Sequence, residues 1–310
     1  MSNFIIRENQ KLNNQDLINA SEWVDYFSLL KPRVMSLVVF SGLIGMSVAP
    51  GEIHIITALI ALISIALGAG AAGAINMWYE ADIDSIMLRT KNRPIPSGRV
   101  VKEEALSLGI IIAGAAIIIM GLLVNFISAA LLFVTIAFYV FVYTMFLKRR
   151  TPQNIVIGGA SGSLPPVIGW TAVTGTIDLF PILIFAIIFF WTPPHFWALS
   201  LYNHSDYRKA NIPMLPVVSG IKKTGIYIFI YSLVLFPITL LPWYFGYMNY
   251  LYFSSAVILG LVFCYKSFQV LVKLNSEKVI IDKMAKKLFN YSIIYLFMLL
   301  LCVYIDSVLM

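Results

Sequence analysis

Charged residues are scarce in this chain. They make up 12% of its 310 residues, whereas apolar residues make up 60%. Soluble globular proteins carry about 25% charged residues, because their surfaces face water. A composition so poor in charge excludes an ordinary soluble domain, and we expect the lipid bilayer to be the main solvent of the chain.

Cysteine is almost absent, and so is any targeting signal. Cys264 and Cys302 both lie inside apolar runs, which excludes a disulfide framework and a cysteine metal site. Residues 1–24 form a polar segment without the apolar core of a signal peptide, so we expect this segment to stay in the cytoplasm. Residues 25–310 are expected to form a single transmembrane domain. The chain also lacks a convincing internal repeat, which removes support for an inverted-repeat transporter.

Long apolar runs make up most of the chain. A helix that spans a bilayer needs about 20 apolar residues. Runs of roughly that length follow one another at about residues 32–49, 53–75, 105–124, 126–147, 155–173, 179–201, 224–245, 249–272 and 289–309. The predicted fold is therefore an all-α polytopic membrane protein with about nine transmembrane helices.

Lysine and arginine are missing from every second turn between these runs. If the runs alternate across the bilayer, all 22 Lys and Arg residues fall on one side. The positive-inside rule places that side, and the N-terminus, in the cytoplasm, with the C-terminus on the opposite side of the cell inner membrane. The net charge of +7 then reflects membrane topology. Nucleic acid is not an expected partner, because a soluble basic domain is missing.

Two long polar loops lie on the predicted cytoplasmic side, at about residues 76–104 and 202–223. In the first loop, Asn76, Glu80 and Asp84 recur at intervals of four residues. If the preceding helix continues into the loop, these three oxygen-bearing side chains share one face. Carboxylate and amide oxygens suit Mg²⁺, which also takes oxygens from substrate phosphates. The spacing therefore predicts a Mg²⁺ site.

A basic run follows these carboxylates. Arg89, Lys91 and Arg93 lie a turn or two further along, in a position to bind phosphate oxygens. The alternative is a solvated loop that is held by surface ion pairs, which is the more usual role of neighbouring acidic and basic stretches. The position at the membrane edge favours a functional site, because polar groups are costly there and tend to serve function.

The second loop begins beyond a double proline. Pro193 and Pro194 should kink the sixth predicted helix just before His195, and Asp206 follows in the loop. A single buried histidine is more often a packing residue than a ligand or a catalyst. The kink, and a position about two turns below the loop, favour a functional role for His195. We expect the two loops to form halves of one cavity that opens to the cytoplasmic side.

These segments together resemble the UbiA superfamily of intramembrane prenyltransferases, and within it the branch that farnesylates haem. The resemblance covers about residues 25–305 and includes three further stretches, which are Tyr143 to Arg150, Gly158 to Pro166, and Ile212-Pro213-Met214-Leu215-Pro216. The superfamily commonly has aspartates where Met77, Glu80 and Tyr202 stand here. These departures leave open whether one metal ion is bound or two.

The resemblance implies both an activity and a set of site residues. A farnesyl group would move from farnesyl diphosphate to a vinyl group of haem B, which is a substrate rather than a cofactor, to give haem O. The implied Mg²⁺ ligands are Asn76, Glu80, Asp84 and Asp206, and the implied diphosphate contacts are Arg89, Lys91, Arg93, Lys148 and Lys209. His195 completes the implied catalytic set as the contact to haem, either as an axial ligand or as a residue that positions water. Implied partners are the bilayer and a downstream haem-modifying enzyme or terminal oxidase assembly factors.

Two other functions stay open on the sequence. A prenyltransferase for an aromatic quinone or chlorin precursor would share the acidic spacing, but not the basic run or the Ile-Pro-Met-Leu-Pro stretch. A transporter would also have many helices, yet it predicts polar residues at the bilayer midplane, where the runs of this chain are apolar.

Overall fold

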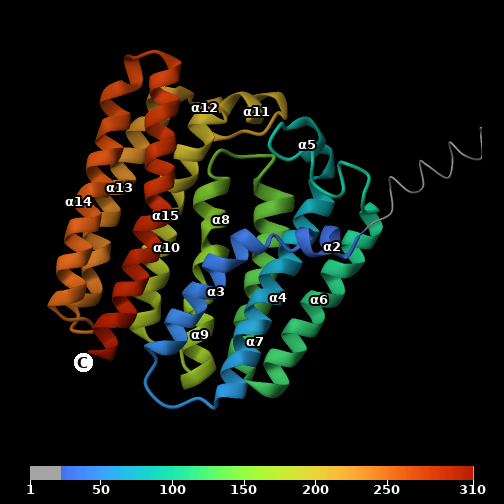
Figure 1. Ribbon diagram of the computed structural model, residues 1–310, viewed down its shortest axis with the longest axis vertical. Helices are drawn as coiled ribbons and strands as arrows, with labels where there is room; N and C mark the ends of the chain where they lie inside the picture. The colour runs from blue at the N-terminus through green and yellow to red at the C-terminus, as the bar shows by residue number, and fades with distance from the viewer. Residues whose placement is uncertain (1–21, 310) are drawn as a thin grey trace, which may run out of the picture.

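Helices account for most of residues 22–309, which is the part of the chain that the computed structural model describes, the side chains of Arg33 and Val34 excepted (Figure 1). The predicted N-terminal segment 1–24 lies almost wholly outside the described residues. Seven helices in the described part are long and apolar enough to cross a membrane: α4 (Ile55–Tyr79), α6 (Lys102–Leu123), α7 with its continuation η1 (Phe126–Leu147), α10 (Leu179–Tyr202), α13 (Gly220–Tyr244), α14 with η2 (Tyr250–Asn275) and α15 (Lys278–Val308). The chain is thus an all-α, multi-pass membrane protein.

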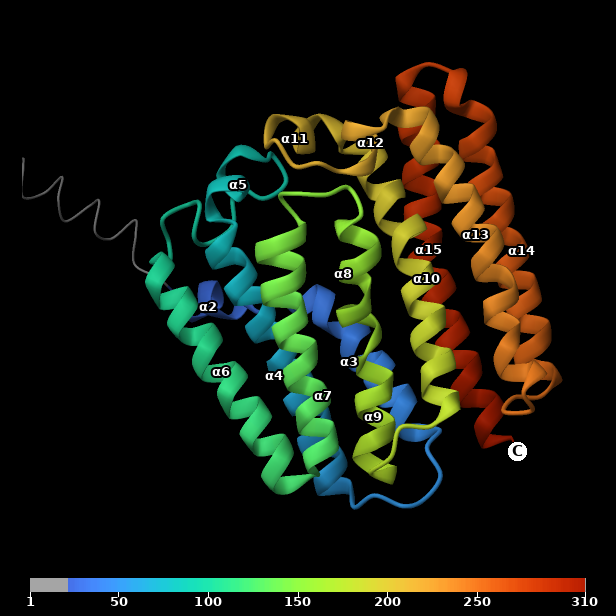
Figure 2. The same ribbon diagram turned by 180° about the vertical axis from the view of Figure 1, so that it is seen from behind.

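The two remaining apolar runs form shorter helices. The first becomes α3 (Pro32–Ser47). The fifth is divided into α8 (Asn154–Ser163) and α9 (Pro165–Thr174), which follow each other end to end (Figure 2). Pro165 starts α9 because a proline has no backbone N–H to continue a helix but fits its first turn. The count of nine crossings stays a prediction.

Three short helices gather at one end of the bundle. They are α5 (Ala81–Ile86), α11 (His204–Lys209) and α12 (Leu215–Val218), and we call this end the polar end (Figures 1 and 2). The short α6–α7 and α13–α14 turns and the C-terminus lie at the opposite end (Figure 1). Another short helix, α2 (Trp23–Leu29), lies across α4 rather than along it. Residues far apart in the sequence therefore meet at the polar end.

The start of α15 departs furthest from the predicted apolar runs. The ninth run begins at about residue 289, but α15 begins at Lys278, so the intervening lysine-rich stretch is helical. Lysine is a good helix former, and hydrophobicity alone does not detect it. The helix α10 continues through Pro193 and Pro194 to Tyr202, close to the predicted end at about residue 201, and the kink at the double proline stays a prediction.

Glycines bring α3 and α9 into backbone contact. A Cβ atom added to Gly45 would lie 2.0 Å from the carbonyl oxygen of Pro166, and one added to Gly169 would lie 2.0 Å from that of Gly42. Small residues allow such close approach between membrane helices. This contact fixes α3 in the bundle, with its N-terminal end directed towards the site.

Candidate active site

The first loop keeps a helical path beyond the end of α4. The backbone N–H of Glu80 donates to the Asn76 carbonyl at 3.0 Å, and that of Asp84 donates to the Glu80 carbonyl at 2.8 Å. Glu80 is the junction between α4 and α5. Because the i to i+4 bonds continue, Asn76, Glu80 and Asp84 follow one another along one side, and each is only 2% exposed.

Each of these three side chains is held by a cation from a different segment. The cations are Lys31 between α2 and α3, Arg93 in the loop after α5, and Lys148 at the end of η1. Lys31 Nζ donates to Asn76 Oδ1 at 2.6 Å, Arg93 to Asp84 at 2.7 Å, and Lys148 to Glu80 at 2.5 Å. We call these six residues the polar cluster. Asn76 also donates to the Thr144 hydroxyl at 3.1 Å, which fixes the orientation of its amide.

Burial disfavours the charged form of both Lys31 and Lys148, but the net pKa shifts of the two lysines have opposite signs. Burial, with a smaller contribution from the nearby Arg93 guanidinium, lowers the pKa of Lys31 to about 7, although the Glu80 carboxylate acts in the opposite direction. Burial also works against the charged form of Lys148, but the Glu80 carboxylate outweighs it and raises the pKa of Lys148 above its usual value. Lys148 is therefore a firmly protonated amine, held next to a buried carboxylate.

One oxygen of the polar cluster is left without a partner. Glu80 Oε1 is buried and accepts no hydrogen bond within residues 22–309. Such an atom is costly unless a cation or a donor satisfies it. The described residues contain no group of three His, Cys, Asp or Glu side chains that could hold a metal, so Asp206 does not join Glu80 and Asp84 in such a group. A donor set of one amide and two carboxylates still fits Mg²⁺, which commonly shares its ligands with substrate phosphates.

The second loop packs directly on the first. Ile83 and Met87 from the first loop share an apolar cluster with Tyr207 and Ile212 from the second. Asp206 lies on α11 within this layer and is 7% exposed. The structure thus brings both predicted halves of the site to the same end of the bundle.

The predicted phosphate-binding residues divide into two groups. Arg93 and Lys148 belong to the polar cluster, whereas Arg89, Lys91 and Lys209 are exposed on the loops. Lys31 was not among the predicted residues. In the sequence, only its position directly before Pro32, at the start of the first apolar run, distinguishes Lys31 from other lysines. Its partner Asn76 is 45 residues away, so the sequence does not indicate their contact.

The solvated ion pair considered as an alternative does occur, at Asp82. Arg149 donates to both carboxylate oxygens of Asp82, at 2.8 and 2.9 Å, and stacks on the Tyr79 ring. Asp82 is 62% exposed. Neighbouring carboxylates of one loop therefore have opposite environments, since Asp82 faces outwards and Glu80 and Asp84 face inwards.

His195 lies in an aromatic cage between α10 and α15. Its ring stacks between Trp191, at 4.3 Å between ring centroids, and Phe289, at 4.6 Å. Its Nδ1 atom is 2.6 Å from the Ser292 hydroxyl on α15. The residue is 7% exposed. This environment is that of a well-packed histidine, and a contact to haem stays a prediction.

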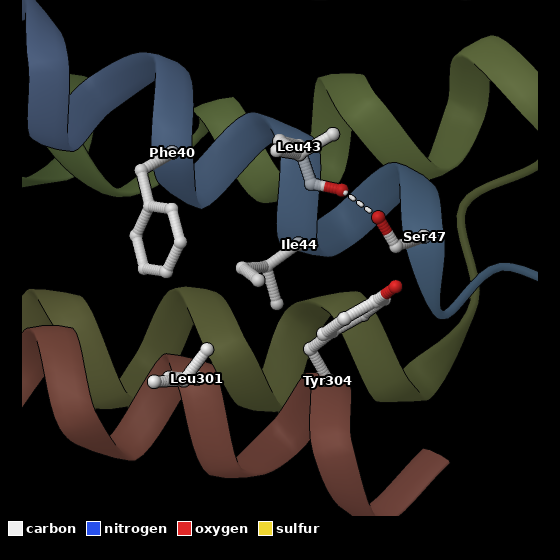
Figure 3. Close-up of a pocket in the computed structure, with 6 residues that line it drawn as sticks. All are labelled: Phe40, Leu43, Ile44, Ser47, Leu301 and Tyr304. Carbon is white, nitrogen blue, oxygen red and sulfur yellow. Dashed lines mark hydrogen bonds between the residues drawn. The ribbon is translucent and has the colours of Figure 1, made fainter. Parts of the chain in front are cut away.

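A groove of about 260 Å³ lies away from the polar cluster, between α3 and α15 (Figure 3). Phe40, Leu43 and Ile44 line one side, and Leu301 and Tyr304 line the other. The Ser47 hydroxyl donates a hydrogen bond to the Leu43 carbonyl of its own helix. With so few polar atoms, the groove suits apolar chains and not a diphosphate. The cavity predicted to open to the cytoplasm stays a prediction.

Comparison with known proteins shows to which family this chain belongs. A model of the UbiA prenyltransferase family matches residues 38–303, which is most of the chain. The chain belongs to the UbiA prenyltransferase family. The bundle that holds the polar cluster is therefore a UbiA bundle.

Relatives within the UbiA family carry a narrower name. A protoheme IX farnesyltransferase of Parvibaculum lavamentivorans is 55% identical over 285 residues, which are 92% of this chain and 89% of the relative. Another, from Ehrlichia ruminantium, is 54% identical over 286 residues, with 92% and 95% covered.

Solved structures share the fold at low identity. A structure described in work on digeranylgeranylglyceryl phosphate synthase superposes with a TM-score of 0.76 at 18% identity, covering 92% of this chain and 98% of the other. A UbiA homologue from Archaeoglobus fulgidus, bound to DMAPP and Mg²⁺, gives 0.66 at 14% identity, covering 88% and 99%.

Proposed function

We propose that this protein transfers a farnesyl group from farnesyl diphosphate to a vinyl group of haem B, and so produces haem O. The observation that carries the reaction class is the polar cluster, in which buried carboxylates and cations converge at one end of an apolar bundle. Relatives named protoheme IX farnesyltransferase, more than 50% identical over nearly their whole length, support the choice of acceptor.

The chemistry of the donor explains why such a cluster is needed. An allylic diphosphate breaks its carbon–oxygen bond when the departing diphosphate is electrostatically stabilised. Asn76, Glu80 and Asp84 would hold Mg²⁺, with Asp206 as the proposed ligand from the second loop. The metal would supply Lewis-acid stabilisation of the phosphate oxygens. Arg93 and Lys148 provide charge-assisted hydrogen bonds to the same oxygens, and Arg89, Lys91 and Lys209 attract the anion from the loops.

The vinyl group of the acceptor then attacks the farnesyl carbon as diphosphate leaves, and water adds to the resulting cation beside the porphyrin and loses a proton to solvent, which gives the hydroxyl group. His195 is the proposed contact to haem. Nδ1 is occupied by Ser292, so Nε2 is the ring nitrogen that would meet the iron or the water. The rings of Trp191 and Phe289 hold the imidazole plane for either role.

The proposed topology follows from charge. The polar end would face the cytoplasm, with nine crossings of the cell inner membrane and the C-terminus on the other side. The diphosphate is soluble and highly charged, so a site on the cytoplasmic face admits it without passage through lipid. A haem-modifying enzyme or terminal oxidase assembly factors would receive haem O.

Pigment analysis tests this function. Membranes from a host that lacks its own activity of this kind would be supplied with the chain, and the haems would be separated by chromatography. We expect haem O to appear from haem B in the presence of farnesyl diphosphate. Prenylation of 4-hydroxybenzoate in place of haem B would instead indicate a quinone-type prenyltransferase. The absence of any prenylated product would contradict the proposal.

A further inference from the structure

The junction between α2 and α3 has an unusual backbone. Lys31 adopts φ 53° and ψ 56°, the left-handed region, and is followed directly by Pro32. A residue before proline normally prefers an extended backbone, and the left-handed region is unfavourable for a non-glycine residue. Strain of this kind persists where the surrounding structure imposes it, often at functional sites. The fold therefore holds Lys31 at this turn against local preference.

The aliphatic part of Lys31 lies on a glycine of α4. A Cβ atom added to Gly73 would lie 3.3 Å from Lys31 Cδ and 3.6 Å from Cγ. Asn76, which receives the amine, is three residues further along the same helix face. The lack of a side chain at Gly73 thus gives the lysine a path along α4 into the polar cluster.

The charge of Lys31 is balanced differently from those of its neighbours. Lys148 pairs with the Glu80 carboxylate, and Arg93 pairs with the Asp84 carboxylate. Lys31 donates to the amide oxygen of Asn76, which is neutral. When Lys31 is protonated, the polar cluster holds three cations and two carboxylates, and the positive charge without a carboxylate partner is that of Lys31. An anionic ligand gains most from such a charge.

We propose that Lys31 is a further substrate-binding residue, whose ammonium group contacts the diphosphate of the prenyl donor. The inference rests on the proposed function only in that the ligand is a prenyl diphosphate. It does not depend on haem B as the acceptor. The turn between α2 and α3 thus becomes part of the diphosphate site, although it lies outside both long polar loops.

Binding of inorganic pyrophosphate with Mg²⁺ to the purified full-length protein tests this assignment, by titration calorimetry in detergent. Lys31→Met keeps most of the aliphatic stem over Gly73 and removes the charge. We expect it to weaken pyrophosphate binding about 10- to 100-fold, as for loss of a charged hydrogen bond. Lys31→Arg should bind within about threefold of the wild type, since the charge is retained. Lys102→Met is the matched control, because Lys102 is an exposed lysine of the polar end that lies outside the polar cluster.

A second variant guards against misfolding. Lys31→Gly suits the left-handed backbone, so it should fold while still losing the amine. In turnover assays both variants should raise the KM for farnesyl diphosphate and leave that for haem B unchanged, a pattern that general loss of structure does not produce. Lys31→Met and Lys31→Gly that bind pyrophosphate as tightly as the wild type would overturn the assignment, as would a wild type that does not bind it.

The same measurements separate the two proposals. A wild type that binds pyrophosphate with Mg²⁺ but makes no haem O would refute the proposed acceptor, while the Lys31 comparison would still be decided by binding. If Lys31→Met binds pyrophosphate and makes haem O as well as the wild type does, the proposed role of Lys31 is refuted, and the proposed function is not affected.

Discussion

Two parts of the candidate site, the polar cluster and the His195 cage, differ in kind. The polar cluster on α4 and α5 is built from charges that come from separate segments and pair with one another. The His195 cage between α10 and α15 is built from stacked rings and one hydroxyl. The first suits a highly charged leaving group, and the second suits a large, flat and mostly apolar ligand. Under the proposed function, the polar cluster would bind the donor and the His195 cage would contact the acceptor, so that separate elements of the bundle would recognise the two substrates.

The largest effect is expected from removing both buried carboxylates of the cluster. Glu80→Gln combined with Asp84→Asn removes the charges proposed to hold Mg²⁺, and we expect haem O formation to fall at least about 1000-fold. The protein should still insert into membranes, because both side chains keep their size. Haem O is measured by chromatography of membrane extracts, and insertion by the amount of protein in the membrane fraction.

Asp82→Asn is the matched control for that variant. Asp82 is in the same loop, but it is 62% exposed and pairs with Arg149. We expect turnover to change less than about twofold, as for other exposed ion pairs. Turnover that survives the double substitution, or that falls equally with Asp82→Asn, would contradict the assignment of the metal site to the inward-facing residues.

The His195 cage gives the next largest expected effect. His195→Phe keeps a ring between Trp191 and Phe289 but removes both nitrogens. We expect kcat for haem B to fall about tenfold, while binding of pyrophosphate with Mg²⁺ is unchanged. Ser292→Ala keeps the imidazole but removes the hydroxyl that contacts its Nδ1 atom. We expect the kcat of this variant to lie between those of the wild type and His195→Phe. Unchanged haem O formation in His195→Phe would show that the cage only packs the helices.

The smallest expected effect is the pH dependence of the stability that the Arg149–Asp82 ion pair contributes. Partial burial disfavours the charged form of Asp82, but hydrogen bonds from Arg149 outweigh it and lower the pKa of Asp82 below its usual value. A lowered pKa means that the pair stabilises the fold above about pH 4, and that this contribution is lost as the pH falls further. Since the pair is exposed, the contribution is at most about 1 kcal/mol. The difference in thermal stability between the wild type and Arg149→Met should therefore narrow from pH 6 to pH 3, and a constant difference would contradict the pairing.

Much of the architecture follows from the sequence alone. The scarcity of charge and the lengths of the apolar runs predict membrane helices, since a backbone in lipid must satisfy its own hydrogen bonds. The interval of four between Asn76, Glu80 and Asp84 places them along one helix side wherever the helix continues. Both are local or compositional properties. The helix-forming lysines that start α15 were missed because hydrophobicity does not record helix propensity.

Only the tertiary structure decides which charges meet. Lys31, Arg93 and Lys148 lie 45, 9 and 68 residues from the oxygens that they contact. One loop contains both the buried Glu80 and the exposed Asp82, and nothing in their order along the chain separates them. The sequence by itself determined the solvent of this protein, its helices and the segments that carry polar chemistry. The tertiary structure decided the partners, because electrostatic interaction depends on distance in space and on burial, and the packing of α3, η1 and the first loop sets both.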